Sequence, residues 1–204
     1  LASVESFACL DLSFLSELPP QVAEGVHLDG FVKDIVDWFY RIGMPDALSE
    51  CFVVQAVEAD FFEPGSPAGF LAVRVPLMGW NWAPLIAQMC LEGAVASSSI
   101  PELCEGQRLA YRSICPQLAM PASDGRHTLA HWGYLDDLGA LGISQRIAEG
   151  EHPPSRIAEV RDELAQHLKD LGLVLHKEET GLPLECLGIV FVEAEGRYYL
   201  RPQD

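Results

Sequence analysis

The stretch HWGYLDDLGALG, residues 131–142, places two adjacent aspartates, Asp136 and Asp137, in the middle of an apolar run. Neighbouring carboxylates repel each other, and a buried carboxylate without a partner is costly in free energy. The apolar arms on either side predict a β-hairpin, although the glycines weaken the prediction for the second arm. The pair is therefore either a solvated turn or a place where a cation binds.

The composition is that of a folded domain. The chain has 204 residues, of which 49% are hydrophobic, so it can bury a core. Its first residue is leucine, from which we expect a piece of a longer protein, and it carries neither a signal peptide nor an apolar run long enough to span a membrane. The six cysteines are scattered without a CxxC pair, which argues against a zinc site or a disulfide framework and favours an intracellular, reducing compartment.

The charge is strongly acidic. The chain has 13 basic and 30 acidic residues, for a net charge of −17, and its first Lys or Arg is Lys33. Proteins that bind nucleic acid without a partner usually carry a basic surface. This composition weighs against nucleic-acid binding by this chain alone.

The hydrophobic pattern predicts an α+β fold with a mostly antiparallel sheet backed by helices. A helix is expected after Pro154, where apolar residues recur at helical spacing until Gly172. The other expected elements are strands over 30–40, 51–57 and 70–76, a helix over 81–96, a short helix within 97–117, a hairpin over 127–144, and closing strands over 173–177, 184–194 and 197–202.

Paired aspartates on a tight turn suit a hard cation such as Mg²⁺, which takes oxygen ligands. A third carboxylate beside them would complete a site for two metals, the arrangement used for in-line phosphoryl or nucleotidyl transfer. Asp34 and Asp37, both on the strand predicted over 30–40, offer that carboxylate. The alternative is that these aspartates are ordinary acids of loops and strand ends.

Five segments, in chain order, resemble motifs A to E of the reverse transcriptase palm: DIVDWFY (34–40), GWNWAP (79–84), YLDD (134–137), LVLHKEET (173–180) and LECLGIVF (184–191). The resemblance implies a polymerase palm of a retrotransposon-like element over 31–192. Residues 1–30 would be a connector or a remnant of the fingers, and residues 193–204 a tail.

The resemblance implies roles for particular residues. Asp34, Asp136 and Asp137 would form the acidic triad that holds two Mg²⁺ ions, or Mn²⁺, with the main-chain carbonyl of Ile35 as a further ligand. Lys177 would stand near the departing pyrophosphate as a cation or general acid. The residues implied for substrate binding are Phe39 as a gate against the ribose 2′-OH, Met78, Gly79 and Trp80 near the incoming base and template, and Tyr134 near the primer end.

The implied activity is RNA-directed DNA polymerisation. The partners would be an RNA template, a DNA primer, a dNTP, and the fingers and thumb of a parent protein, with no membrane. An alternative is a catalytically inactive palm kept as an interaction or scaffold module, which the net charge of −17 favours. Another is a different two-metal phosphotransfer domain. The alternatives for single residues are that Phe39 and Trp80 pack in the core and that Lys177 is a solvated lysine at a strand end.

Overall fold

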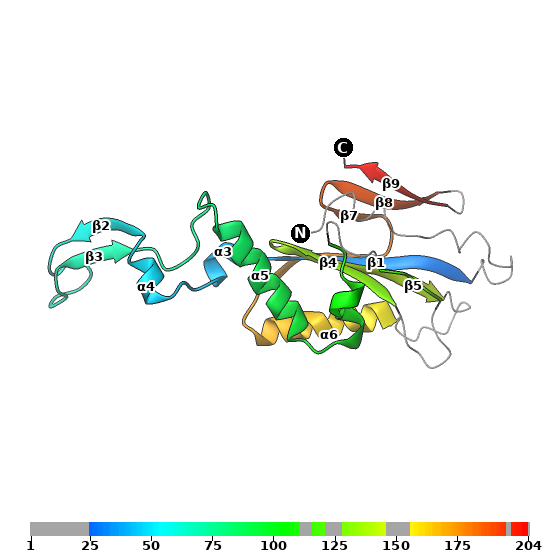
Figure 1. The fold of residues 1–204 in the computed structure, drawn as a ribbon, viewed down its shortest axis with the longest axis horizontal. Coiled ribbons are helices and arrows are strands. Elements are labelled where there is room, and N and C mark those ends of the chain that lie inside the picture. Colours follow the sequence, from blue (N-terminus) through cyan, green and yellow to red (C-terminus); the bar gives the residue numbers. More distant parts are fainter. Residues whose placement is uncertain (1–24, 111–115, 121–127, 146–155, 195–196, 204) are drawn as a thin grey trace. The chain divides into compact units, whose positions relative to one another are not determined.

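The computed structural model describes residues 25–110, 116–120, 128–145, 156–194 and 197–203. The chain divides into two compact units, one of residues 1–36 with 91–204 and the other of residues 37–90 (Figure 1). The α+β fold predicted from the sequence is confirmed, since antiparallel sheets and a few helices make up both units. In the part of the chain that is described, no helix combines the length and the apolar character that crossing a bilayer requires.

A four-stranded antiparallel sheet organises the first unit. Its strands are β1 (Val26–Ile35), β4 (Leu129–Tyr134), β5 (Asp137–Gln145) and β6 (Leu175–Thr180), in the order β4-β5-β1-β6. β1 is hydrogen-bonded to β5 on one edge and to β6 on the other. An inner strand covered on both faces is apolar on both, and the run Phe31–Val32 in the middle of β1 is buried on each side.

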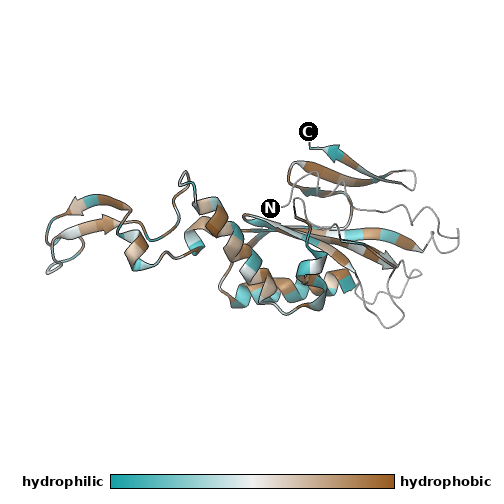
Figure 2. Cartoon of the chain, in the orientation of Figure 1, coloured by the Kyte–Doolittle hydropathy of each residue, from teal (hydrophilic) through white to brown (hydrophobic). Residues whose placement is uncertain are grey.

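The two faces of this sheet are covered by different elements (Figure 1). The helix α6 (Arg156–Asp170) packs on one face, where the buried residues of its apolar stripe contact β1, β5 and β6. On the other face Leu28 and Val32 share a core cluster with β7 (Leu184–Cys186) and β8 (Ile189–Ala194), whose ribbons are mostly apolar (Figure 2). The strand β9 (Arg197–Pro202) pairs with β8 and lies in the segment predicted to be a tail.

The segment after α5 (Ala83–Ala96) contains two 3₁₀ turns, η2 (Pro101–Leu103) and η3 (Glu105–Gln107). The short helix predicted within 97–117 is not found in residues 97–110, and residues 111–115 lie outside the described part of the chain. Pro101 stands at the first turn of η2, the position where its missing N–H costs nothing. The side chain of Glu102 binds the Arg156 guanidinium, with Nε 2.6 Å from Oε1, and thereby ties η2 to the start of α6.

The second unit begins where β1 has ended. The strand predicted over 30–40 stops at Ile35, and a short helix α3 (Trp38–Arg41) follows. Asp37, expected on that strand, instead has a φ of 56° and caps α3 by accepting the Tyr40 N–H through its main-chain carbonyl. Aspartate tolerates this left-handed conformation better than most residues. The other elements of the unit are α4 (Asp46–Ser49), β2 (Val53–Val57), β3 (Gly69–Ala72) and the first half of α5.

We predict that Gly139→Ala destabilises the fold by about 1–3 kcal/mol, because the added methyl group overpacks the core. A Cβ at position 139 would lie 2.5 Å from the main-chain oxygen of Phe31 and 2.4 Å from the ring of Trp132. The matched control is Gly93→Ala in α5, where the new Cβ meets nothing within 4 Å; we expect a gain of up to about 1 kcal/mol from helix propensity. Urea denaturation measures both, and equal stability of the two variants would contradict the packing at Gly139.

Candidate functional site

The two aspartates of the hairpin stand at its tip. Tyr134 and Asp137 form the last pair between β4 and β5, so Leu135 and Asp136 make a two-residue loop. Leu135 has a φ of 57°, the region that such loops demand of their first residue and that glycine or asparagine usually supplies. A leucine in this conformation is strained, and strained residues of this kind are common at functional sites.

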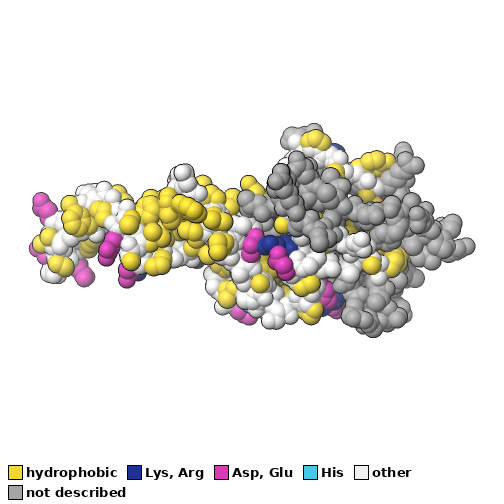
Figure 3. All heavy atoms as spheres, in the orientation of Figure 1, with side chains coloured by type: hydrophobic (Ala, Val, Ile, Leu, Met, Phe, Trp, Pro, Cys, Tyr) yellow, Lys and Arg dark blue, Asp and Glu magenta, His cyan; other side chains and the backbone are white. Residues whose placement is uncertain are grey.

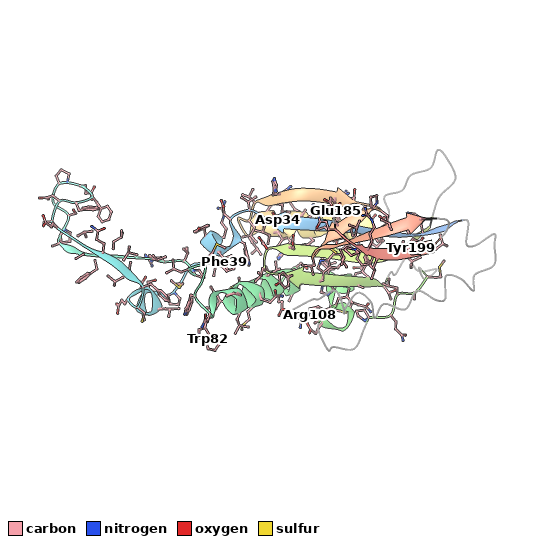
Figure 4. All side chains as sticks on the ribbon, turned by 90° about the horizontal axis from the view of Figure 1, so that it is seen from above. Asp34, Phe39, Trp82, Arg108, Glu185 and Tyr199 are labelled. Carbon is pink, nitrogen blue, oxygen red and sulfur yellow. The ribbon has the colours of Figure 1, made fainter. Side chains whose placement is uncertain are left out.

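The end of β1 lies beside this loop. Asp34 pairs with Asp137 in the β1–β5 register, and the Ile35 N–H donates to the main-chain oxygen of Asp136 at 3.1 Å. Two acidic segments about a hundred residues apart in the sequence therefore meet at one end of the sheet, where β1 carries Asp34 (Figure 4). The structure thus brings together the three aspartates that the sequence singled out.

The electrostatics of the loop favour a cation. Partial burial raises the pKa of the Asp136 carboxyl, and the negative charge of Asp34 raises it further. Hydrogen bonds from the backbone N–H groups of Asp136 and Asp137 lower that pKa, but the net shift is upward. Ionised Asp136 is therefore poorly compensated by the protein, and a bound cation would relieve the repulsion.

The other neighbour of β1 adds two residues. His176 pairs with Asp34, and its Nδ1 lies 3.8 Å from Oδ2 of Asp34. The register between β1 and β6 shifts at this point, because Lys33 pairs with Glu178 and Asp34 pairs with His176. Lys177 lies between these two partners, so its backbone runs beside Asp34. The sequence interpretation missed His176, because six dispersed histidines show no ligand spacing; its place directly before Lys177 was the one available signal.

The structure offers fewer metal ligands at this place than the resemblance implies. Within the described residues, no three His, Cys, Asp or Glu side chains are grouped so that they could hold one ion. The charge of Asp34 acts on the Asp136 carboxyl, so these two carboxylates are the candidate donors at this end of the sheet. Oxygen donors of this type suit Mg²⁺ or Mn²⁺.

Most residues predicted to bind substrate belong to the second unit. Phe39 lies in α3, not on a strand, and is half-buried. Met78 is 75% exposed, and Gly79 has a φ of 97° that favours glycine. The half-buried Trp80 packs edge-on against Phe52, with ring centroids 4.9 Å apart. Tyr134, in the first unit, ends β4 and is half-buried.

A pocket of about 390 Å³ opens in the first unit between α5, the two 3₁₀ turns and β4. Its wall includes buried His131, whose Nε2–H donates to the main-chain oxygen of Cys104 at 3.0 Å, and burial lowers the pKa of that imidazole. Arg108 (Figure 4) also lines the pocket, and its guanidinium forms ion pairs with Glu92 and Glu105. Sequence reasoning missed this pocket, since its residues carry no motif.

No protein-family model matches the chain, and no curated protein matches it either. The resemblance to the reverse transcriptase palm therefore rests on the five motif segments and on where the structure places them.

We predict that Asp136→Asn raises the unfolding temperature by about 1–3 °C near pH 8 in EDTA. The folded-state pKa of Asp136 is raised, so ionising it opposes folding, and this penalty appears as the pH rises through that pKa. Near pH 3 the carboxyl is protonated in both states, and the gain should vanish. Circular dichroism melts measure the effect.

The control for this experiment is Asp162→Asn. The Arg161 guanidinium lowers the pKa of the Asp162 carboxyl, so its ionised form favours folding and its replacement should lower the unfolding temperature at neutral pH. A fall in unfolding temperature for both variants near pH 8 would contradict the repulsion inferred at Asp136.

Proposed function

We propose that this chain is the palm region of a reverse transcriptase, which transfers a nucleotide from a dNTP to a primer 3′-OH on an RNA template. The observation that carries the proposal is the pairing of Asp34 with Asp137 across β1 and β5, with Asp136 at the adjoining turn. This pairing brings the segments similar to motifs A and C together at one end of the sheet, as the proposed palm would require.

The order of elements supports the same proposal. The first unit runs β1, α5, β4, β5, α6, β6 along the chain, and its sheet has the order β4-β5-β1-β6. This is the split β-α-β arrangement, in which the first strand lies between the third and the last. The segment similar to motif D supplies β6, next to β1, and the one similar to motif E supplies β7 and the start of β8.

In this proposal the carboxylates of Asp34 and Asp136 would hold Mg²⁺. The Ile35 carbonyl and the Asp137 carboxylate would lie at the edge of the same site. Bound Mg²⁺ supplies charge that lowers the pKa of an attacking hydroxyl and stabilises a leaving phosphate. The protein's own residues set the charge of this site: burial and the charge of Asp34 raise the pKa of Asp136, and hydrogen bonds from the backbone N–H groups of Asp136 and Asp137 offset part of that shift. Lys177 would donate a proton or charge to the pyrophosphate, and Phe39 would exclude the ribose 2′-OH.

The second candidate function is a non-catalytic palm that serves as an interaction module. The net charge of −17 favours it, since template and primer are polyanions that such a surface repels. Basic fingers and thumb elsewhere in a parent protein would reconcile the charge with polymerisation. In this second candidate, Asp34 and Asp136 would have no part in nucleotide transfer.

We predict that Asp34→Asn and Asp136→Asn each reduce dNTP incorporation by at least about a hundredfold, because each removes a carboxylate that would hold Mg²⁺ at the reacting phosphate. The assay is extension of a primed RNA template with Mg²⁺ or Mn²⁺. Asp170→Asn is the matched control, since Asp170 only accepts a hydrogen bond from Gln166 on α6, and it should retain activity.

A second readout does not depend on turnover. Millimolar Mg²⁺ should raise the unfolding temperature of the native chain, which binds it when folded, more than that of Asp136→Asn. If the full-length parent protein incorporates no dNTP with either metal, or if its Asp136→Asn variant stays active, the polymerase proposal fails and the interaction module becomes the favoured candidate.

A further inference from the structure

Exposed apolar side chains concentrate on the hairpin of the second unit. Phe70 is 73% and Phe62 68% exposed. Together with the other exposed apolar residues of this hairpin they form what we call the hairpin surface: Val53, Val54, Phe61, Phe62, Phe70 and Leu71. Figure 3 shows these yellow side chains over β2 and β3, with acidic groups in magenta beside them.

This hairpin is incomplete as a sheet. Successive residues of a strand point to opposite faces, so exposure of both Phe70 and Leu71 means that neither face of β3 is covered. Among the strands in the described part of the chain, β2 and β3 alone make up this sheet, and an isolated two-stranded sheet is at best marginally stable in water. Apolar patches of this kind mark interaction sites.

The open edges differ between the two strands. The β2–β3 pairing is irregular between Val53 and Gln55, which places a bulge on β2. Bulges twist an edge away from further pairing, whereas a regular edge offers its N–H and C=O groups to another strand. The edge of β3 is therefore the better place for strand addition.

The negative charge of the hairpin indicates which kind of partner it can bind. Its connecting loop carries Glu58, Asp60 and Glu63, and there is no Lys, Arg or His from 42 to 73. Glu58 and Glu63 are exposed, and neither has an ion-pair partner among the described residues. Apolar strands beside unpaired carboxylates complement a segment that presents apolar and basic side chains together.

Other occupants match this charge poorly. A second copy of the chain brings the same net charge of −17. Residues 1–24 contain no Lys or Arg and so cannot meet the carboxylates. Nucleic acid and anionic membranes are repelled by the loop.

We propose that the hairpin surface binds an extended, basic segment of another polypeptide, which adds a strand to the edge of β3. Its main chain pairs with β3, its apolar side chains cover Val54 and Phe70, and its Lys or Arg side chains reach Glu58 and Glu63. This is the strand-addition mode of peptide recognition. The proposal holds whether or not the chain polymerises nucleotides.

The experiment uses a ten-residue peptide of alternating valine and lysine, labelled at one end, and fluorescence anisotropy with the full chain. We expect saturable binding that weakens as salt rises. Val54→Ser with Phe70→Ser should weaken it at least about tenfold, as expected for interface hot spots. Leu171→Ser with Val174→Ser is the matched control: both residues are exposed apolar residues of the other unit, and affinity should be unchanged.

Two further measurements separate the parts of the proposal. Glu58→Lys with Glu63→Lys should weaken the valine–lysine peptide and strengthen a valine–glutamate peptide; Asp60 is left intact because its Oδ1 accepts the Gly65 N–H. Hydrogen exchange should slow at the amides of residues 69–72 when the valine–lysine peptide is added. The exchange result also tests the site if a variant fails to fold.

Several outcomes overturn the proposal. These are equal affinity for the valine–glutamate peptide, unchanged binding by the Val54/Phe70 variant, and no added protection at 69–72. Dimers of the chain that form without peptide and disappear in that variant would assign the surface to a second copy. Binding of single-stranded RNA or of phosphatidylcholine vesicles that requires Phe70 would assign it to nucleic acid or membrane.

Discussion

The pairing of β1 on both of its edges is the constraint on which the first unit depends. β5 binds one edge and β6 the other, and each face of the strand is covered by apolar side chains. Gly139 lets the Trp132 ring and the main chain of β1 each approach β5 closely. Because register in a sheet is set by which residues face the core, the same apolar pattern that buries β1 also fixes Asp34 opposite Asp137.

Two features of the protein are unfavourable in isolation. At the end of β1, partial burial of the Asp136 carboxyl and, to a smaller extent, the charge of Asp34 raise the pKa of Asp136, which makes its ionisation costly. On the second unit, the hairpin surface leaves aromatic side chains in water. Such features are common where a ligand compensates them. The ligands that we propose for the two places differ: a divalent cation for the carboxylates, and an apolar, basic chain for the hairpin.

Much of the secondary structure could be predicted from local patterns. The helical spacing from Ile157 to Leu168 and the stop at Gly172 agree with α6, and the apolar arms around Asp136 agree with β4 and β5. A prediction was wrong where conformation depends on a single dihedral angle: Asp37 adopts a left-handed φ that ends the strand early. The part of 97–117 that the structure describes contains 3₁₀ turns that begin at Pro101.

The sequence by itself determined the α+β class, the hairpin and the candidate acids, because periodicity and residue chemistry are local properties. Only the tertiary structure decided which of these residues meet. Strand order placed His176 and Asp136 on either side of Asp34, and no spacing along the chain encodes that neighbourhood. Exposure is likewise a property of the whole fold: Phe70 is an apolar residue of a strand predicted from the sequence, and in the structure its side chain is 73% exposed.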